Sequence, residues 1–157
     1  MTTEIKDFWK DFATETVETV LETPIWLLTN QANMLSSKTK NLLRGEVSTY
    51  SEQGVIYNTL YIVAPRLDDY RYALIQVVSG PAPYPVFVYD RSGADYTSLS
   101  VSVKFPNSAA PELPKASFAA RDYADFEKAI EAILSSKETE GIIRSLMSQS
   151  QALSSAS

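Results

Sequence analysis

Residues 55–78, VIYNTLYIVAPRLDDYRYALIQVV, decide the fold class of this chain. Val55–Ala64 and Tyr70–Val78 are rich in β-branched and aromatic residues, which favour strands. Residues 65–69 have turn chemistry, because proline presets φ and aspartate side chains bond to nearby backbone amides. A connection this short joins antiparallel neighbours, since a parallel crossover needs a dozen or more residues. The stretch therefore predicts an antiparallel hairpin.

Further strands are predicted on both sides of this hairpin. Residues 46–52 form a weak strand before a turn at Gln53-Gly54, and residues 84–89 resume extended structure after a loop rich in Pro and Gly. Residues 96–105 alternate apolar and polar side chains most regularly, so one face is expected to be buried. The pattern predicts an antiparallel meander of four to five strands.

Two helices are predicted before the sheet. Residues 3–22 place apolar side chains at i, i+3, i+4 and i+7, which is typical of an amphipathic helix. Thr23-Pro24 then predicts the start of a second helix, with Thr as N-cap and Pro at the first helical position. This second helix is expected to end near Leu43, with Gly45 as the left-handed residue beyond it.

One or two helices are predicted after the sheet, packed on one face. A proline-rich connection over residues 106–117 leads to Asp122, which can cap a helix with an apolar stripe. Ser135 and Glu138 resemble a capping box that starts a short final helix. We therefore expect a single α+β domain over residues 1–150, followed by a frayed tail over residues 151–157.

The composition excludes several kinds of chemistry. The chain has no His and no Cys among its 157 residues, which removes the Ser-His-Asp triad, thiolate nucleophiles and Cys-ligated zinc. We predict no metal and no cofactor. The net charge of −5 argues against a nucleic-acid partner, because such binders normally have a basic surface.

The sequence contains neither a membrane-spanning run nor a signal peptide pattern, and this predicts where the protein is located. No run of about 18 uncharged apolar residues occurs, so we expect no membrane insertion. Residues 1–12 lack the basic and apolar regions of a signal peptide. Together with the absence of Cys, this favours a cytoplasmic protein.

No group of residues is predicted to be catalytic. The G-x-S-x-G, G-x-G-x-x-G and G-x-x-x-x-G-K patterns are missing. The adjacent Asp68 and Asp69, and the pair Asp90 and Asp95, lie at predicted turns, where turn chemistry explains them. An enzyme that uses only Asp, Glu, Tyr or Lys stays open as an alternative.

Tyrosine is concentrated in the predicted sheet. Eight of the nine Tyr residues lie between Tyr50 and Tyr96. Tyr57 and Tyr61 share strand parity, as do Tyr70 and Tyr72, so each pair can line one face. Tyr suits half-buried sheet surfaces, but it is also enriched in binding hot spots. These four residues are our candidate binding residues, with structural packing as the alternative.

The apolar stripe of residues 3–22 is the second candidate surface. It includes Phe8, Trp9 and Phe12, which favour burial. The stripe either packs on the chain's own sheet or is buried against a partner or a second copy of the chain. A homo-oligomer through this helix is compatible with the pattern.

Part of the chain resembles small bacterial proteins of no assigned function. The resemblance is carried by a P-x-x-x-L-x-x-Q-A-x-x-L-x-x-K-T pattern over residues 24–39, followed by a sheet. The motif A-P-x-L-x-x-Y-x-Y over residues 64–72 and Tyr84-Pro85-Val86 fit the same pattern, so about half of the chain is covered. The resemblance implies a bacterial or phage source and no particular activity.

Three functions follow from these observations. We expect a non-enzymatic protein-binding module, with an immunity, chaperone-like or regulatory role in a bacterium or phage. A small-ligand-binding domain, with its pocket between sheet and helices, is the first alternative. An enzyme without His or Cys is the second.

Overall fold

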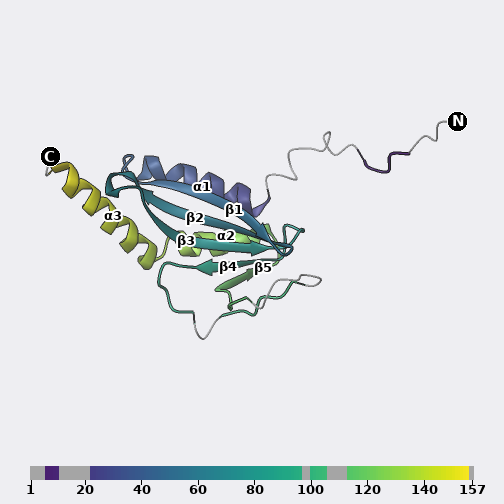
Figure 1. The fold of residues 1–157 in the computed structure, drawn as a ribbon. Coiled ribbons are helices and arrows are strands. Elements are labelled where there is room, and N and C mark those ends of the chain that lie inside the picture. Colours follow the sequence, from purple (N-terminus) through teal and green to yellow (C-terminus); the bar gives the residue numbers. More distant parts are fainter. Residues whose placement is uncertain (1–5, 11–21, 97–99, 106–112, 156–157) are drawn as a thin grey trace.

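The computed structural model describes residues 6–10, 22–96, 100–105 and 113–155. Helix α1 precedes the sheet and helices α2 and α3 follow it (Figure 1). In chain order the elements are α1 (Pro24–Lys38), β1 (Arg44–Glu52), β2 (Val55–Ala64), the 3-10 helix η3 (Pro65–Leu67), β3 (Tyr70–Ser79), β4 (Val86–Asp90), β5 (Phe118–Ala120), α2 (Tyr123–Leu134) and α3 (Lys137–Ser155). The strands form one antiparallel sheet in the order β1-β2-β3-β4-β5, so the predicted α+β class and meander are confirmed.

The hairpin turns of the sheet use left-handed backbone conformations. Gln53 and Gly54 have φ angles of 51° and 82° and connect β1 to β2. A two-residue loop with both φ values positive matches the twist of the strands that it joins. Between β2 and β3, η3 is followed by Asp68 and Asp69 with φ angles of 57° and 54°. Both turns lie where the sequence predicts them.

Helix α1 begins as predicted but ends earlier. The side chain of Thr23 accepts the Trp26 N–H at 3.4 Å, and proline occupies the first helical position. The helix ends at Lys38 rather than near Leu43. The role predicted for Gly45 is wrong, because this residue lies in β1. A Cβ there would be 2.6 Å from the Cα of Ala32, so glycine allows α1 to pack closely on the sheet.

The prediction of two N-terminal helices is wrong, since α1 is the one helix that the described residues form before the sheet. Residues 6–10, inside the predicted helix 3–22, have no regular secondary structure, and Phe8 and Trp9 are 86% and 82% exposed. Phe12 lies outside the described residues. Periodicity predicts which face of a helix would be buried, but an isolated helix is marginal unless another surface packs against that face.

The prediction of a strand over residues 96–105 is also wrong for residues 96 and 100–105, which the structure describes. Val101 forms an isolated bridge to Ala116, and the residues around it belong to no strand. Residues 97–99 lie outside the described residues. The alternation nevertheless reflects burial, because Val103 is buried and Phe105 packs edge-on against Phe87 at 5.3 Å between ring centroids. The side chains of Val103 and Phe105 thus pack against the sheet, although their segment is not a continuous strand.

The outer strand of the sheet is instead β5, which the sequence did not predict. It pairs with β4 through Val86, Phe87 and Val88. Three residues give too short a periodic pattern to be recognised.

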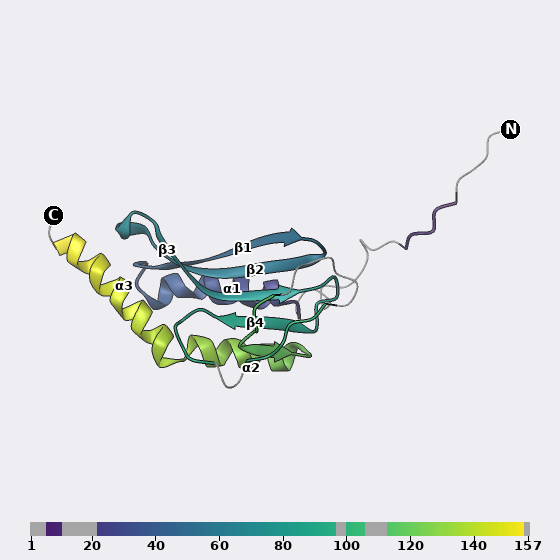
Figure 2. The same cartoon turned by 60° about the horizontal axis from the view of Figure 1, so that its bottom comes forward.

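Two helices follow β5. Asp122 caps α2 and accepts the Asp125 N–H at 2.9 Å, as predicted. The cap of α3 is Ser136 rather than Ser135, because the Ser136 Oγ accepts the Thr139 N–H at 3.2 Å. Helix α3 continues to Ser155 and is longer than the short helix predicted. Figure 2 shows it leaving the body obliquely.

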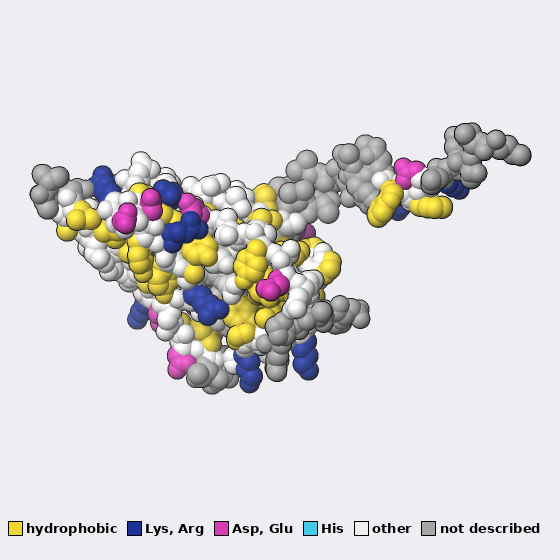
Figure 3. Space-filling view, in the orientation of Figure 1, with side chains coloured by type: hydrophobic (Ala, Val, Ile, Leu, Met, Phe, Trp, Pro, Cys, Tyr) yellow, Lys and Arg dark blue, Asp and Glu magenta, His cyan; other side chains and the backbone are white. Residues whose placement is uncertain are grey.

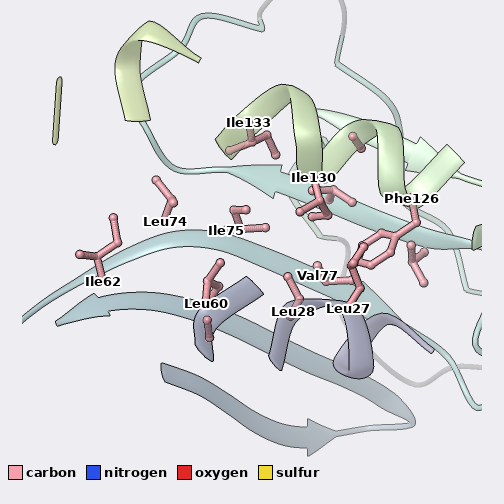
Figure 4. Close-up of a cluster of buried hydrophobic side chains, with 14 of the residues drawn as sticks. Leu27, Leu28, Leu60, Ile62, Leu74, Ile75, Val77, Phe126, Ile130 and Ile133 are labelled. Carbon is pink, nitrogen blue, oxygen red and sulfur yellow. The ribbon is translucent and has the colours of Figure 1, made fainter. Parts of the chain in front are cut away.

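Both faces of the sheet carry buried side chains. The helix-side cluster joins α1 and α2 to the sheet, and its side chains point toward one another between the layers (Figure 4). A smaller cluster covers part of the other face, consisting of Val55, Val78, Phe87, Tyr89, Val103 and Ala116. None of the described helices combines the length and apolar composition needed to cross a bilayer.

Candidate functional site

The two candidate Tyr pairs lie on opposite faces of the sheet. Tyr72 is paired in register with Ile62 and packs against the helix-side cluster. Tyr57 is paired with Val78 and packs against the cluster on the other face. Directly opposed residues of antiparallel strands share a face. The four tyrosines therefore form no single surface.

Tyr70 and Tyr72 line an open groove between β3 and α3, which we call the tyrosine groove. Its volume is about 620 Å³. The apolar residues Leu67, Ile142 and Leu146 complete its lining from η3 and α3. These residues are separated by about half of the chain, and the oblique path of α3 past the hairpin brings them together.

The polar groups of the tyrosine groove lie mainly on α3. Glu138, Ser145 and Gln149 are exposed and border it. The Tyr72 hydroxyl donates a hydrogen bond to the Arg91 carbonyl, which fixes the ring, whereas Tyr70 is 48% exposed. The groove thus combines a fixed aromatic ring and an accessible one with apolar walls and a polar rim.

Gly141 keeps the tyrosine groove open on the α3 side. It lies in the interior of α3 and lines the groove, and a Cβ added there would meet no atom within 4 Å. Glycine in a helix interior is unfavourable by about 1 kcal/mol relative to alanine. A larger side chain at this position would occupy the groove rather than disturb the core.

Tyr57 and Tyr61 make local contacts on the other face. Tyr57 stacks on Tyr50 of β1 with 4.6 Å between ring centroids. The guanidinium of Arg71 lies 4.5 Å from the centre of the Tyr61 ring and 2.7 Å from a Glu46 carboxylate oxygen. These are cross-strand contacts that stabilise a sheet. Packing of the sheet is sufficient to explain both residues.

A second groove lies among the three helices, and we call it the apolar groove. Its volume is about 230 Å³. Its walls and floor include Leu35, Leu60, Ile62, Leu74, Leu134 and Ile143. Met34, which is 50% exposed, and Lys38 lie at its α1 side. Sequence reasoning missed this groove, because its residues come from six separate elements and no local pattern connects them.

The acidic residues considered in the sequence have structural contacts. Asp90 accepts the Tyr96 hydroxyl at 2.7 Å and the Ser92 N–H at 2.8 Å. Burial, followed by this bond to Asp90, raises the pKa of Tyr96 above its ordinary value. Asp68 and Asp69 occupy the left-handed turn after η3 and are exposed. Within the described ranges, no three His, Cys, Asp or Glu residues are grouped so that they could hold a metal ion.

The N-terminal aromatic residues lie apart from both grooves. Figure 3 shows the apolar side chains of residues 6–10 apart from the body of the fold. In the same view, charged side chains of both signs are intermixed over the end of the sheet near α3. No protein-family model, curated protein or solved structure matches this chain.

Proposed function

We propose that this chain is a non-enzymatic protein-binding module and that the tyrosine groove receives its partner. The observation that carries this proposal is the position of Tyr70 and Tyr72 beside Ile142 and Leu146 in an open groove. Tyrosine is enriched at binding hot spots because it offers a large apolar area together with a hydroxyl. A bacterial or phage partner would fit an immunity, chaperone-like or regulatory role.

The shape of the tyrosine groove supports a segment of a protein as the occupant. The groove extends along α3 from Glu138 to Gln149, which is about 17 Å at the rise of a helix. A helix or an extended peptide can lie along such a groove and place alternate apolar side chains against it. Its polar rim can then satisfy the backbone or polar groups of the partner.

Filling the groove at Gly141 tests the proposal. Gly141→Phe places a ring in the groove, and Ser148→Phe places the same ring on an exposed position of α3 that does not line it. A partner captured from a native lysate is then measured by calorimetry against both variants. We expect Gly141→Phe to weaken binding at least about tenfold, or about 1.4 kcal/mol, and Ser148→Phe to bind as wild type.

Two outcomes would contradict this proposal. One is a native lysate from which no protein is recovered at physiological salt. The other is a partner whose affinity is the same for wild type and Gly141→Phe, because that partner would bind elsewhere. Circular dichroism of both variants should match wild type, since the added Cβ of residue 141 meets no neighbouring atom.

A small ligand is the second candidate for the same groove. The volume of about 620 Å³ falls in the range of small-molecule sites, which are roughly 300–1,000 Å³. Native mass spectrometry separates the two candidates. A small bound mass on wild-type protein that is absent from Gly141→Phe would favour the small ligand over a protein partner.

A further inference from the structure

Two large aromatic side chains at the N-terminus are left in water. Phe8 is 86% and Trp9 is 82% exposed, and neither contributes to the two buried clusters. Burial of aromatic side chains is strongly favourable, and adjacent exposed ones commonly mark a contact site. The pair is therefore a candidate for contact with an apolar surface.

The apolar groove is such a surface. Leu35, Leu134 and Ile143 line it from α1, α2 and α3, and sheet residues form part of its floor. It reaches the exposed surface at Met34, which is 50% exposed. The groove thus offers aliphatic walls, with which an aromatic ring packs well.

A furrow leads from the start of α1 to this groove. Gln31 and Leu134 line both the apolar groove and a neighbouring hollow of about 380 Å³ between α1 and α2. Leu27 and Glu127 line that hollow nearer the starts of the two helices. Trp26 and Tyr123, with 6.4 Å between ring centroids, bring those two starts together.

The N-terminal segment enters the fold at the head of the furrow. The Tyr84 hydroxyl donates a hydrogen bond of 2.7 Å to the Glu22 carbonyl, and α1 begins two residues later. From Thr23 to Leu35 the path along α1 is about 18 Å, at 1.5 Å per residue. The 12 residues between Trp9 and Glu22 span about 18 Å at helical rise and about 40 Å when extended. The connection is therefore long enough in either conformation.

We propose that the apolar groove is the docking site for the chain's own N-terminal segment, with Phe8 and Trp9 inserted between α1 and α3. Charges support this placement. Asp7 would approach Lys38 at the groove, and Lys10, on the side of Trp9 that leads back to Glu22, would approach Glu131 in the furrow. The tether favours this occupant over a second copy, because an attached segment has a high effective concentration at a site within its reach.

Quenching of Trp9 fluorescence measures docking. Trp26→Phe leaves Trp9 as the one tryptophan, because the chain has two. In this background, Met34→Glu places a carboxylate at the groove, and Asn33→Glu places one at an exposed neighbour that does not line it. Met34 is half exposed, so its replacement leaves the buried core intact.

We expect Trp9 to be protected from iodide and acrylamide in the Trp26→Phe protein and in the Asn33→Glu variant. Met34→Glu should restore the quenching of a free indole and move the emission to longer wavelength. The ratio of docked to free segment should fall roughly tenfold or more. Equal quenching in all three proteins would overturn the proposal.

An engineered disulfide distinguishes docking within one chain from docking between two. The chain has no Cys, so Asp7→Cys and Lys38→Cys introduce its only two thiols, at positions that docking would bring together. We expect rapid formation of an intramolecular bond, and slow formation when Lys38→Cys is replaced by Ser148→Cys. Adding Met34→Glu should slow the first reaction. Bonds mainly between two chains would overturn docking within one chain and indicate an exchanged dimer.

Discussion

Two glycines of this chain have opposite structural roles at the residue scale. Gly45 lies where α1 meets β1, and a Cβ there would be 2.6 Å from both the Cα and the carbonyl oxygen of Ala32. Gly141 lies in α3 with open space around its Cα. Neither residue has a left-handed backbone conformation, so the space around the missing side chain distinguishes them.

Substitution by alanine should therefore have opposite effects at these two positions. Gly45→Ala pushes α1 away from the sheet, and we expect it to destabilise the fold by about 1–3 kcal/mol. Gly141→Ala should stabilise the fold by up to about 1 kcal/mol, because alanine is the better helix former. Urea unfolding of both variants measures these differences. A Gly45→Ala midpoint equal to wild type would show that the close approach of α1 is not required.

Tyr84 should make the stability of the fold sensitive to alkaline pH. Burial, followed by the neighbouring Tyr123, Glu22 and Asp122, raises its pKa from 10.0 to about 12. The folded state thus holds the phenolic proton more tightly than the unfolded state. Its contribution is fully present below pH 10 and is lost as the pH rises through about 12.

The corresponding variant is Tyr84→Phe, which removes the titrating hydroxyl and its bond to the Glu22 carbonyl. We expect the decrease in the free energy of unfolding between about pH 10 and 12 to be smaller in this variant than in wild type. Chemical unfolding at a series of pH values measures it. If Tyr84→Phe and wild type lose stability equally between these pH values, groups other than Tyr84 cause the loss.

At the scale of elements, the end of α1 depends on one buried hydroxyl. Thr39 is 2% exposed and follows the last residue of α1. Its Oγ1 accepts the Leu43 N–H at 3.1 Å and lies 3.0 Å from the Leu35 carbonyl, to which it can donate. One side chain thus satisfies backbone groups of the helix end and of the residue that leads into β1.

Replacing this hydroxyl with a methyl group should be costly. Thr39→Val keeps the shape but leaves the buried Leu43 N–H without its acceptor, and we expect a loss of about 1–3 kcal/mol. Ser37→Ala is the control, because the Ser37 hydroxyl is exposed and bonds only to the Met34 carbonyl within its own helix. That change should stay within about 0.5 kcal/mol. Similar losses in both variants, measured by thermal unfolding, would contradict this role for Thr39.

Elements with strong local signals were predictable from the sequence. The bounds of β2 agree with the prediction at both ends, and the caps Thr23 and Asp122 occupy the predicted positions. In each case the residues that carry the pattern lie in, or within a few residues of, the strand or helix end that they predict. The predictions failed for residues 6–10 and around Val101, because there the outcome depends on whether distant segments cover an apolar face.

At the scale of the whole molecule, the sheet lies between two unequal layers. Three helices cover one face, and the segments around Val103 and Ala116 cover only part of the other. Helix α3 contacts the rest of the fold along a limited part of its length, with Thr139, Leu146 and Ser150 as its buried residues. Stability should therefore decrease from the central strands toward the end of α3.

Hydrogen exchange tests this gradient. We expect the amides of β2 and β3 to exchange only through global unfolding, because these strands are paired on both sides and their core side chains are buried. Amides after Ser150 should exchange fastest within α3, since Gln151, Ala152 and Leu153 are exposed. Uniform protection along α3, measured by mass spectrometry, would contradict the gradient.

From residue types alone follow the α+β class, the turns on both sides of β2, the caps Thr23 and Asp122, and the absence of imidazole and thiol chemistry. These properties depend on residue type and short-range spacing. It took the tertiary structure to place Tyr70 and Tyr72 beside α3 and Tyr57 against the cluster on the other face. Strand register and the path of α3 bring residues far apart in the chain into contact, so no local pattern contains either groove.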